Sequence, residues 1–145
     1  MFRLYPPSYR LDLALPIAFV FHEGSGNVEQ IATFSGFNKI SEENSFLVIS
    51  FEAINKHWND ERESEQFQEH GRAGNDVAWI KALIPELITI YSVDTTRMYA
   101  TGISNEGIFS QHRAMELSHH FSTVASLTAQ IAAPLSKASS TIHAI

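Results

Sequence analysis

One serine in the chain stands where it could act as a nucleophile. The stretch Tyr99–Gly107 is typical of a short strand, a tight turn that carries Ser104, and the start of a helix. Such a turn strains the backbone and pushes the serine hydroxyl out towards a substrate. Once a base removes its proton, that hydroxyl can attack a carbonyl carbon. The stretch therefore predicts covalent acyl transfer at Ser104, against the alternative that this serine only caps the helix.

The elements around this serine alternate between strand and helix. Continuous apolar runs predict buried strands, and apolar residues at helical spacing predict helices, which Asn27 and either Asn75 or Asp76 begin. The expected strands are the short segment 2–5 and the runs 17–21, 46–51, 98–101 and 121–127, and the expected helices are 27–43, 75–88 and 105–119. Residues 93–97 are expected to form a turn. This order predicts an α/β fold: a mostly parallel sheet of about five strands with helices on both faces, in a single domain over residues 1–145.

Composition argues against several classes of partner and cofactor. The net charge is −6 and no run of basic residues occurs, which argues against nucleic acid and against anionic membrane surfaces. The chain has no cysteine, so it can form neither disulfides nor thiolate metal sites. No stretch approaches the ~20 apolar residues of a membrane span, and no signal peptide is visible. We therefore expect no cofactor, no metal ion and, by default, a cytoplasmic location.

Four motifs occur in an order that points to a known family. Pro6–Tyr9 resembles the opening after a first strand, and Phe19–Gly26 resembles a His-Gly oxyanion loop. Trp58–Asp60 with Asn75–Ile80 resembles the loop and helix before a nucleophile, and Tyr99–Gly107 resembles the nucleophile elbow itself. Together they resemble the α/β-hydrolase esterases related to polyhydroxybutyrate depolymerases and feruloyl esterases. The resemblance implies a serine esterase that hydrolyses small carboxylic esters through an acyl-enzyme on Ser104.

The chain departs from this family pattern in three respects. Glu106 occupies the fifth position of the Gly-x-Ser-x-Gly motif, and glycine comes one residue later, at Gly107. Glu23 stands in the oxyanion loop where the family usually has glycine. Members of the family are considerably longer, and their acid and histidine follow later strands. A truncated, catalytically incomplete homologue that acts as a binding or vestigial module is therefore the alternative to an esterase.

The resemblance also assigns the groups that would assist Ser104. It places the oxyanion hole on the backbone N–H groups of Asn105 and of Glu23 or Gly24, where donors stabilise a developing negative charge. His143 lies in a tail that could reach back to act as the base; otherwise a second chain supplies the base, or none exists. The seven histidines are His22, with an expected structural role, and His57, His70, His112, His119, His120 and His143.

Two further expectations concern surfaces. Trp58 has polar neighbours in a long loop, so we expect it at a surface or a cleft. Phe121–Leu127 is expected to be the final strand, with an open edge whose unpaired N–H and C=O groups are a template for another chain. A C2 dimer is the commonest closed arrangement. The sequence therefore predicts a homodimer or larger homo-oligomer, joined through this edge or through an exchanged C-terminal tail. The resemblance implies a small-molecule ester as its substrate.

Overall fold

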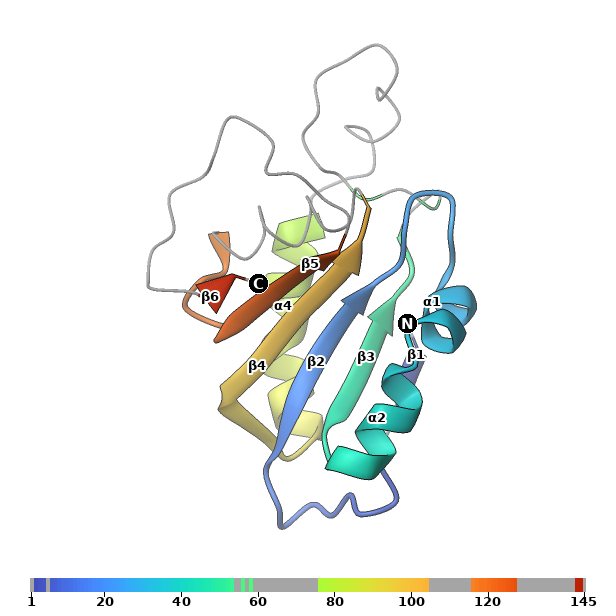
Figure 1. Ribbon diagram of the computed structural model, residues 1–145. Helices are drawn as coiled ribbons and strands as arrows, with labels where there is room; N and C mark the ends of the chain where they lie inside the picture. Colours follow the sequence, from blue (N-terminus) through green and yellow to red (C-terminus); the bar gives the residue numbers. More distant parts are fainter. Residues whose placement is uncertain are drawn as a thin grey trace.

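The computed structural model describes residues 2–4, 6–53, 56, 58, 76–104, 116–127 and 143–144, which build a twisted sheet with helices against it (Figure 1). The strands are β1 (Phe2–Leu4), β2 (Leu15–Phe21), β3 (Leu47–Phe51), β4 (Val93–Ile103), β5 (Thr123–Leu127) and β6 (His143–Ala144). The helices are α1 (Val28–Phe34), α2 (Phe37–Asn44) and α4 (Asp76–Ile90). Their order along the chain is that of an α/β fold, as the sequence predicts.

The sheet has its strands in the order β1-β3-β2-β4-β5-β6. The β1 strand runs antiparallel to β3, and every other neighbouring pair is parallel. Phe21, the last residue of β2, pairs with Phe51 on one side and with Gly102 on the other. The carboxyl ends of β2, β3 and β4 therefore meet at one edge of the sheet, which we call the carboxyl edge. The mostly parallel sheet is confirmed.

The two faces of the sheet bury different sets of side chains. Successive residues of a strand point to opposite faces, so Phe19 and Phe21 join the cluster under α4, while Ala18 and Val20 join the cluster under α1. Figure 1 shows α4 behind the sheet and α1 and α2 in front of it. Both faces of β2 are therefore apolar, which is why its sequence is a continuous apolar run. Helices on both faces are confirmed.

The helix expected over residues 27–43 is two helices. Asn27 begins α1 as predicted, because its side chain accepts a hydrogen bond of 2.9 Å from the N–H of Gln30. The chain then breaks at Gly36, whose φ of 67° is left-handed. A continuous right-handed helix cannot pass through such a residue, and glycine adopts this conformation at least cost. The break separates α1 from α2.

The turn expected at 93–97 lies inside a longer β4 strand. Leu15 pairs with Val93, but Ile17 pairs with Met98, so the register shifts between these two pairs. Within the shift, the Asp94 carboxylate accepts hydrogen bonds from the N–H of Thr96 at 2.9 Å and from its hydroxyl at 2.6 Å. The expected turn was therefore wrong as an element: residues 93–97 belong to β4, because β2 pairs with β4 on both sides of the register shift.

The outer edge of β5 is partly covered. The strand predicted over residues 121–127 is β5, but it is not the final strand, because β6 pairs parallel to it at Thr123 and Val124. The expectation of a wholly open edge is therefore corrected to one that is covered over these two residues. Among the residues that the structure describes, no helix is long and apolar enough to cross a membrane.

Candidate active site

The connections of β2 and β4 leave in opposite directions. After β2 the chain passes through α1 and α2 to β3, while after β4 it continues to β5 on the other side of the sheet. Where the connections of two adjacent parallel strands diverge in this way, a crevice opens outside their carboxyl ends, and ligands of open α/β sheets bind there. The strand order alone thus places a candidate site between the loop after β2 and the turn after β4.

Ser104 lies on the β4 side of this position. It follows Ile103, the last residue of β4, and it is exposed. Its φ is 64°, in the left-handed region that a residue with a Cβ rarely adopts. Its N–H donates to the carbonyl of Leu127 at 2.9 Å, which ties the turn to the end of β5. The predicted strained turn is present, while Asn105, Glu106 and Gly107 lie outside the described residues.

The loop after β2 begins with a fully buried histidine. The Nε2 atom of His22 lies 3.1 Å from the backbone N of Ala53, and its Nδ1 atom lies 2.8 Å from the carbonyl oxygen of Glu23. A backbone N–H can only donate, so Nε2 is the acceptor and Nδ1 carries the proton. His22 is therefore a neutral imidazole with both nitrogens in use. This arrangement agrees with the structural role that the resemblance implies for it.

The loop then makes a tight turn over Glu23–Gly26. The N–H of Gly26 donates to the carbonyl of Glu23 at 2.9 Å, and Ser25 between them has a left-handed φ of 66°. A Cβ on Gly26 would lie 2.8 Å from the Glu23 carbonyl oxygen and 2.9 Å from the Glu23 Cδ. Glycine is therefore required at position 26 because the turn leaves no space for a side chain.

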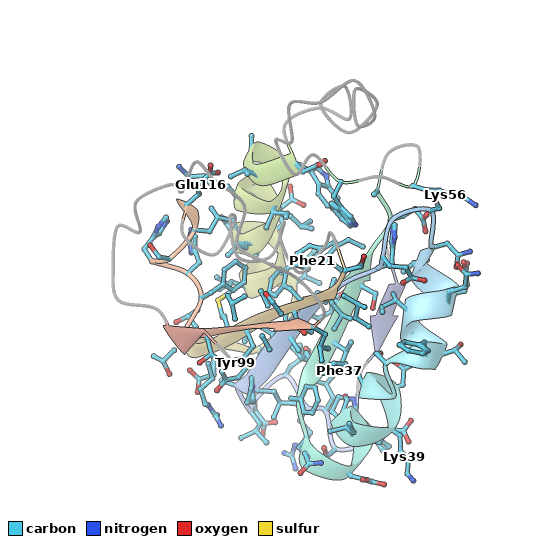
Figure 2. The ribbon with its side chains drawn as sticks, turned by 45° about the horizontal axis from the view of Figure 1, so that its top comes forward. Phe21, Phe37, Lys39, Lys56, Tyr99 and Glu116 are labelled. Carbon is cyan, nitrogen blue, oxygen red and sulfur yellow. The ribbon has the colours of Figure 1, made fainter. Side chains whose placement is uncertain are left out.

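The segment after β3 supports this turn from the side. The N–H of Ser25 donates to the carbonyl of Lys56 at 3.0 Å, and Figure 2 shows Lys56 beside the loop that follows β2. Trp58 is 1% exposed and its ring centroid lies 5.1 Å from that of Phe21 and 5.6 Å from that of His22. The expectation that Trp58 sits at a surface or a cleft was wrong, since its indole fills the space under this loop.

Glu23 and Gly24, two of the expected oxyanion donors, and the expected nucleophile Ser104 follow adjacent strands, β2 and β4. Glu23 and Ser104 each stand two residues beyond the pair Phe21–Gly102. Neighbouring strands in a sheet are about 4.8 Å apart, so the two segments leave the carboxyl edge side by side. The structure thus brings Glu23 and Gly24 to the same edge of the sheet as Ser104. The donor roles of these two N–H groups stay a prediction.

His143 lies at the opposite end of the sheet. It pairs with Thr123 at the beginning of β5, whereas Ser104 follows the pair Ile103–Leu127 at the end of that strand. Leu127 is four residues beyond Thr123, which is about 13 Å along a strand. The structure therefore does not bring His143 and Ser104 together.

Two other histidines form a pair before β5. The ring centroids of His119 and His120 lie 4.0 Å apart in a turn. The expected helix over 105–119 therefore does not reach His119, and His120 follows it as expected. Burial lowers the pKa of His120, and the neighbouring His119 and Lys81 lower it further. His57, His70 and His112 lie outside the described residues. Across the part of the chain that the structure describes, no three His, Asp or Glu side chains gather as a metal site would require.

Sequence reasoning missed Glu52, which connects this loop to β3. Its Oε2 accepts a hydrogen bond of 2.9 Å from the N–H of Val28, the first residue of α1, and its Oε1 lies 3.9 Å from His22 Nε2. The available signal was a carboxylate placed directly after a buried parallel strand. Such a residue lies at the edge where ligand-binding loops meet.

Comparison with known proteins gives consistent results. The family model for esterase PHB depolymerase matches residues 1–145. NocK of Nocardia uniformis subsp. tsuyamanensis, which bears the name of an esterase, is 27% identical over 129 residues, which are 89% of this chain and 37% of NocK. The chain thus spans well under half the length of this relative.

Solved structures share the fold. An acetyl xylan esterase from Aspergillus awamori superposes with a TM-score of 0.67 at 20% identity, over 86% of this chain and 44% of that one. A thermostable esterase gives 0.65 at 18% identity, over 85% and 35%. The fluorophosphonate-binding serine hydrolase FphF of Staphylococcus aureus gives 0.61 at 11% identity, over 85% and 48%. The fold is that of α/β-hydrolase esterases.

Proposed function

Because the chain belongs to the esterase PHB depolymerase family, we propose that it is a carboxylic ester hydrolase with Ser104 as its nucleophile. The observation that carries the proposal is the backbone of Ser104: an exposed serine with a φ of 64° at the carboxyl edge, beside the point where the connections diverge. Backbone strain of this kind costs of order 1–3 kcal/mol and persists mainly at functional sites. A helix cap alone needs no such strain.

In the proposed reaction, a base takes the proton of the Ser104 hydroxyl as its oxygen attacks the ester carbonyl carbon. The carbonyl electrons move onto oxygen, and the N–H groups of Asn105 and of Glu23 or Gly24 stabilise the resulting oxyanion. Collapse of the tetrahedral intermediate breaks the bond to the alkoxy group, which leaves as an alcohol with the proton from the base. Water then releases the acid and restores Ser104 by the same steps. The substrates are small carboxylic esters.

The base comes from outside the described part of the chain in this proposal. His143 is at the wrong end of β5, and His22 uses both nitrogens in buried hydrogen bonds. We propose that a homodimer forms along the outer edge of β5 beyond the residues paired with β6, where Leu127 is 52% exposed. That edge ends beside Ser104, because the Ser104 N–H bonds to Leu127. A histidine of the second copy would then lie near the hydroxyl.

The alternative is a catalytically incomplete module that folds and binds without turnover. The observation that favours it is that neither described histidine considered as a base serves Ser104: His143 pairs with Thr123 at the other end of β5, and both nitrogens of His22 are held in buried hydrogen bonds. Triad members act as a unit, so a serine without its base retains only the catalysis that the oxyanion hole and binding supply.

Hydrolysis of p-nitrophenyl acetate separates the two functions. An esterase is expected to show turnover that Ser104→Ala lowers by at least about 10³-fold with the fold unchanged. A fluorophosphonate probe should label the wild type at Ser104 and leave the variant unlabelled. Turnover that survives Ser104→Ala would identify another nucleophile, and a folded wild type without turnover or labelling would favour the binding module. Light scattering of the same samples tests the homodimer.

A further inference from the structure

We propose that Glu52 is a positioning residue that holds the loop after β2 in the shape needed by the oxyanion. This inference rests on the proposed esterase function, and it assigns Glu52 no contact with the substrate. Glu52 follows Phe51, the last residue of β3, and β3 pairs with β2 through Phe51 and Phe21. The residue therefore stands on a rigid element immediately beside the start of the loop.

The first contact is at the far end of the loop. The Oε2 atom of Glu52 accepts a hydrogen bond of 2.9 Å from the N–H of Val28. The first N–H groups of a helix have no partner within the helix, and Asn27 satisfies only the N–H of Gln30. A carboxylate is favoured at this position because the helix dipole adds to a charge-assisted hydrogen bond. Glu52 thus fastens the start of α1 to β3.

The second contact is at the near end of the loop. Ala53, the next residue, donates its N–H to Nε2 of His22 at 3.1 Å. The same imidazole donates from Nδ1 to the carbonyl of Glu23, which also accepts the N–H of Gly26. The dipeptide Glu52–Ala53 therefore holds residue 22 through its backbone and residue 28 through its side chain.

The turn between these two ends carries the proposed donors. Residues 23–26 form a tight turn, with a left-handed Ser25 and a Gly26 that has no space for a Cβ. A misplacement of a catalytic group by about 1 Å can cost ~10²-fold in rate. Loss of the Glu52 carboxylate frees the α1 end of the loop while the His22 end stays in place. The N–H groups of Glu23 and Gly24 then no longer point at the oxyanion, whereas binding of the ester itself is unchanged.

Three variants test this role: Glu52→Ala, Glu52→Gln and the matched control Glu29→Gln. Glu29 is an exposed carboxylate in the same first turn of α1, so it controls for the loss of negative charge at that helix end. We expect Glu52→Ala to lower kcat for p-nitrophenyl acetate by about tenfold with KM nearly unchanged, since oxyanion donors act in the transition state. Glu52→Gln keeps an acceptor oxygen and should restore most of kcat. Glu29→Gln should match the wild type.

Amide hydrogen exchange gives a second measurement that does not depend on turnover. Glu52→Ala should speed exchange at Ser25, Gly26 and Val28, and the strand amides of β2 should keep their protection. If both kcat and these exchange rates equal the wild type, the positioning role is overturned while the esterase function stands. If the wild-type chain has no turnover, the esterase function fails. The exchange rates alone then decide whether Glu52 holds the loop after β2. If Glu52→Ala does not fold, Glu52→Asp takes its place, because its carboxylate is one methylene shorter and loses the hydrogen bond to Val28. Wild-type kcat and wild-type exchange rates in that variant would overturn the positioning role.

Discussion

The two edges of the parallel sheet are built in different ways. The described residues contain four non-glycine residues with a left-handed φ. Three of them follow the carboxyl ends of β2, β3 and β4: Ser25, Lys56 and Ser104. The fourth, Ser45, precedes β3 at the opposite edge, where the parallel strands begin, which we call the amino edge. The strain is thus concentrated where the candidate site lies. Such strain persists only where the surrounding structure over-determines the backbone.

The loops of the carboxyl edge are held by residues far away in sequence, whereas one turn at the amino edge is held by its own neighbours. Other contacts at the amino edge are also long-range, such as the hydrogen bond of 2.6 Å from the Ser122 hydroxyl to the Thr96 carbonyl. At the carboxyl edge, His22 bonds to Ala53, Ser25 to Lys56 and Ser104 to Leu127, so each loop is held by a different strand's continuation. At the amino edge, Asp94 holds its own neighbours Thr96 and Arg97. The amino-edge turn is therefore encoded locally, whereas the geometry of the candidate site exists only once the sheet has assembled.

The largest expected effect is at the long-range contact of the carboxyl edge. His22→Phe leaves the buried N–H of Ala53 and the carbonyl of Glu23 without their imidazole partners, at about 1–3 kcal/mol for each unsatisfied group. We expect the free energy of unfolding to fall by about 2–5 kcal/mol in urea denaturation. His119→Phe, at an exposed position, should change it by no more than about 0.5 kcal/mol. Equal losses in the two variants would remove the distinction between the edges.

A smaller loss of stability is expected from substitution of two glycines. Gly26 has no space for a Cβ, whereas Gly36 has a backbone conformation that favours glycine. Gly26→Ala places a Cβ 2.8 Å from a backbone oxygen, so we expect a loss of about 1–3 kcal/mol from overpacking and a lower kcat. Gly36→Ala has no atom within 4 Å but a φ of 67°, which costs about 1–2 kcal/mol, and kcat should not change. Urea denaturation and ester turnover, measured together, check both. A drop in kcat with Gly36→Ala would show that the loop is not the sensitive element.

Relief of strain gives a third, still smaller effect. Ser25→Gly removes the left-handed penalty at an exposed residue, so thermal denaturation should show a stabilisation of about 0.5–1 kcal/mol. Ser45→Gly relieves a similar strain but loses the hydrogen bond of 2.8 Å to the Ser8 hydroxyl, and its net gain should be smaller. A destabilised Ser25→Gly would mean that this serine contributes contacts that outweigh its backbone strain.

The smallest effect concerns the amino edge and pH. Hydrogen bonds from Thr96, and then from Arg97, lower the pKa of Asp94 from 3.8 to about 2. A carboxyl with a depressed folded-state pKa contributes stability above pH 3.8 that is lost as the pH falls from 3.8 towards 2. Asp94→Asn should remove this part of the acid dependence of stability, measured by thermal denaturation between pH 5 and pH 2. Unchanged acid dependence would show that the local turn does not need the charge.

Much of the fold could be predicted from sequence because its signals are local or periodic. The apolar runs of β2 and β3 identify buried parallel strands, and Asn27 identifies the start of α1. The division of the helix at Gly36 and the extension of β4 back to Val93 could not be predicted as easily. Both depend on tertiary contacts that override a local pattern. For β4, the contact is the pairing of Val93 with Leu15 of β2, which extends the strand into a segment with a turn pattern.

The candidate site was predicted unevenly for the same reason. The turn at Ser104 has a strong local pattern that predicts a strained backbone, and its φ of 64° confirms the strain. Glu52 and the burial of Trp58 were missed because their partners Val28 and Phe21 lie far away in sequence. The position of His143 could not be predicted either, because the β6 strand has only two residues, which are too few to show a periodic pattern.

The central position of β2 has a consequence for biosynthesis. Phe19 of this strand pairs with Ala100 of β4, 81 positions later in the chain. At roughly 5–20 residues per second, the ribosome needs about 4–16 s to make the second partner after the first. During this interval an apolar strand has one open edge and one incompletely covered face, which is the state most prone to aggregation. We therefore expect the nascent chain to depend on a chaperone that holds β2 until β4 emerges.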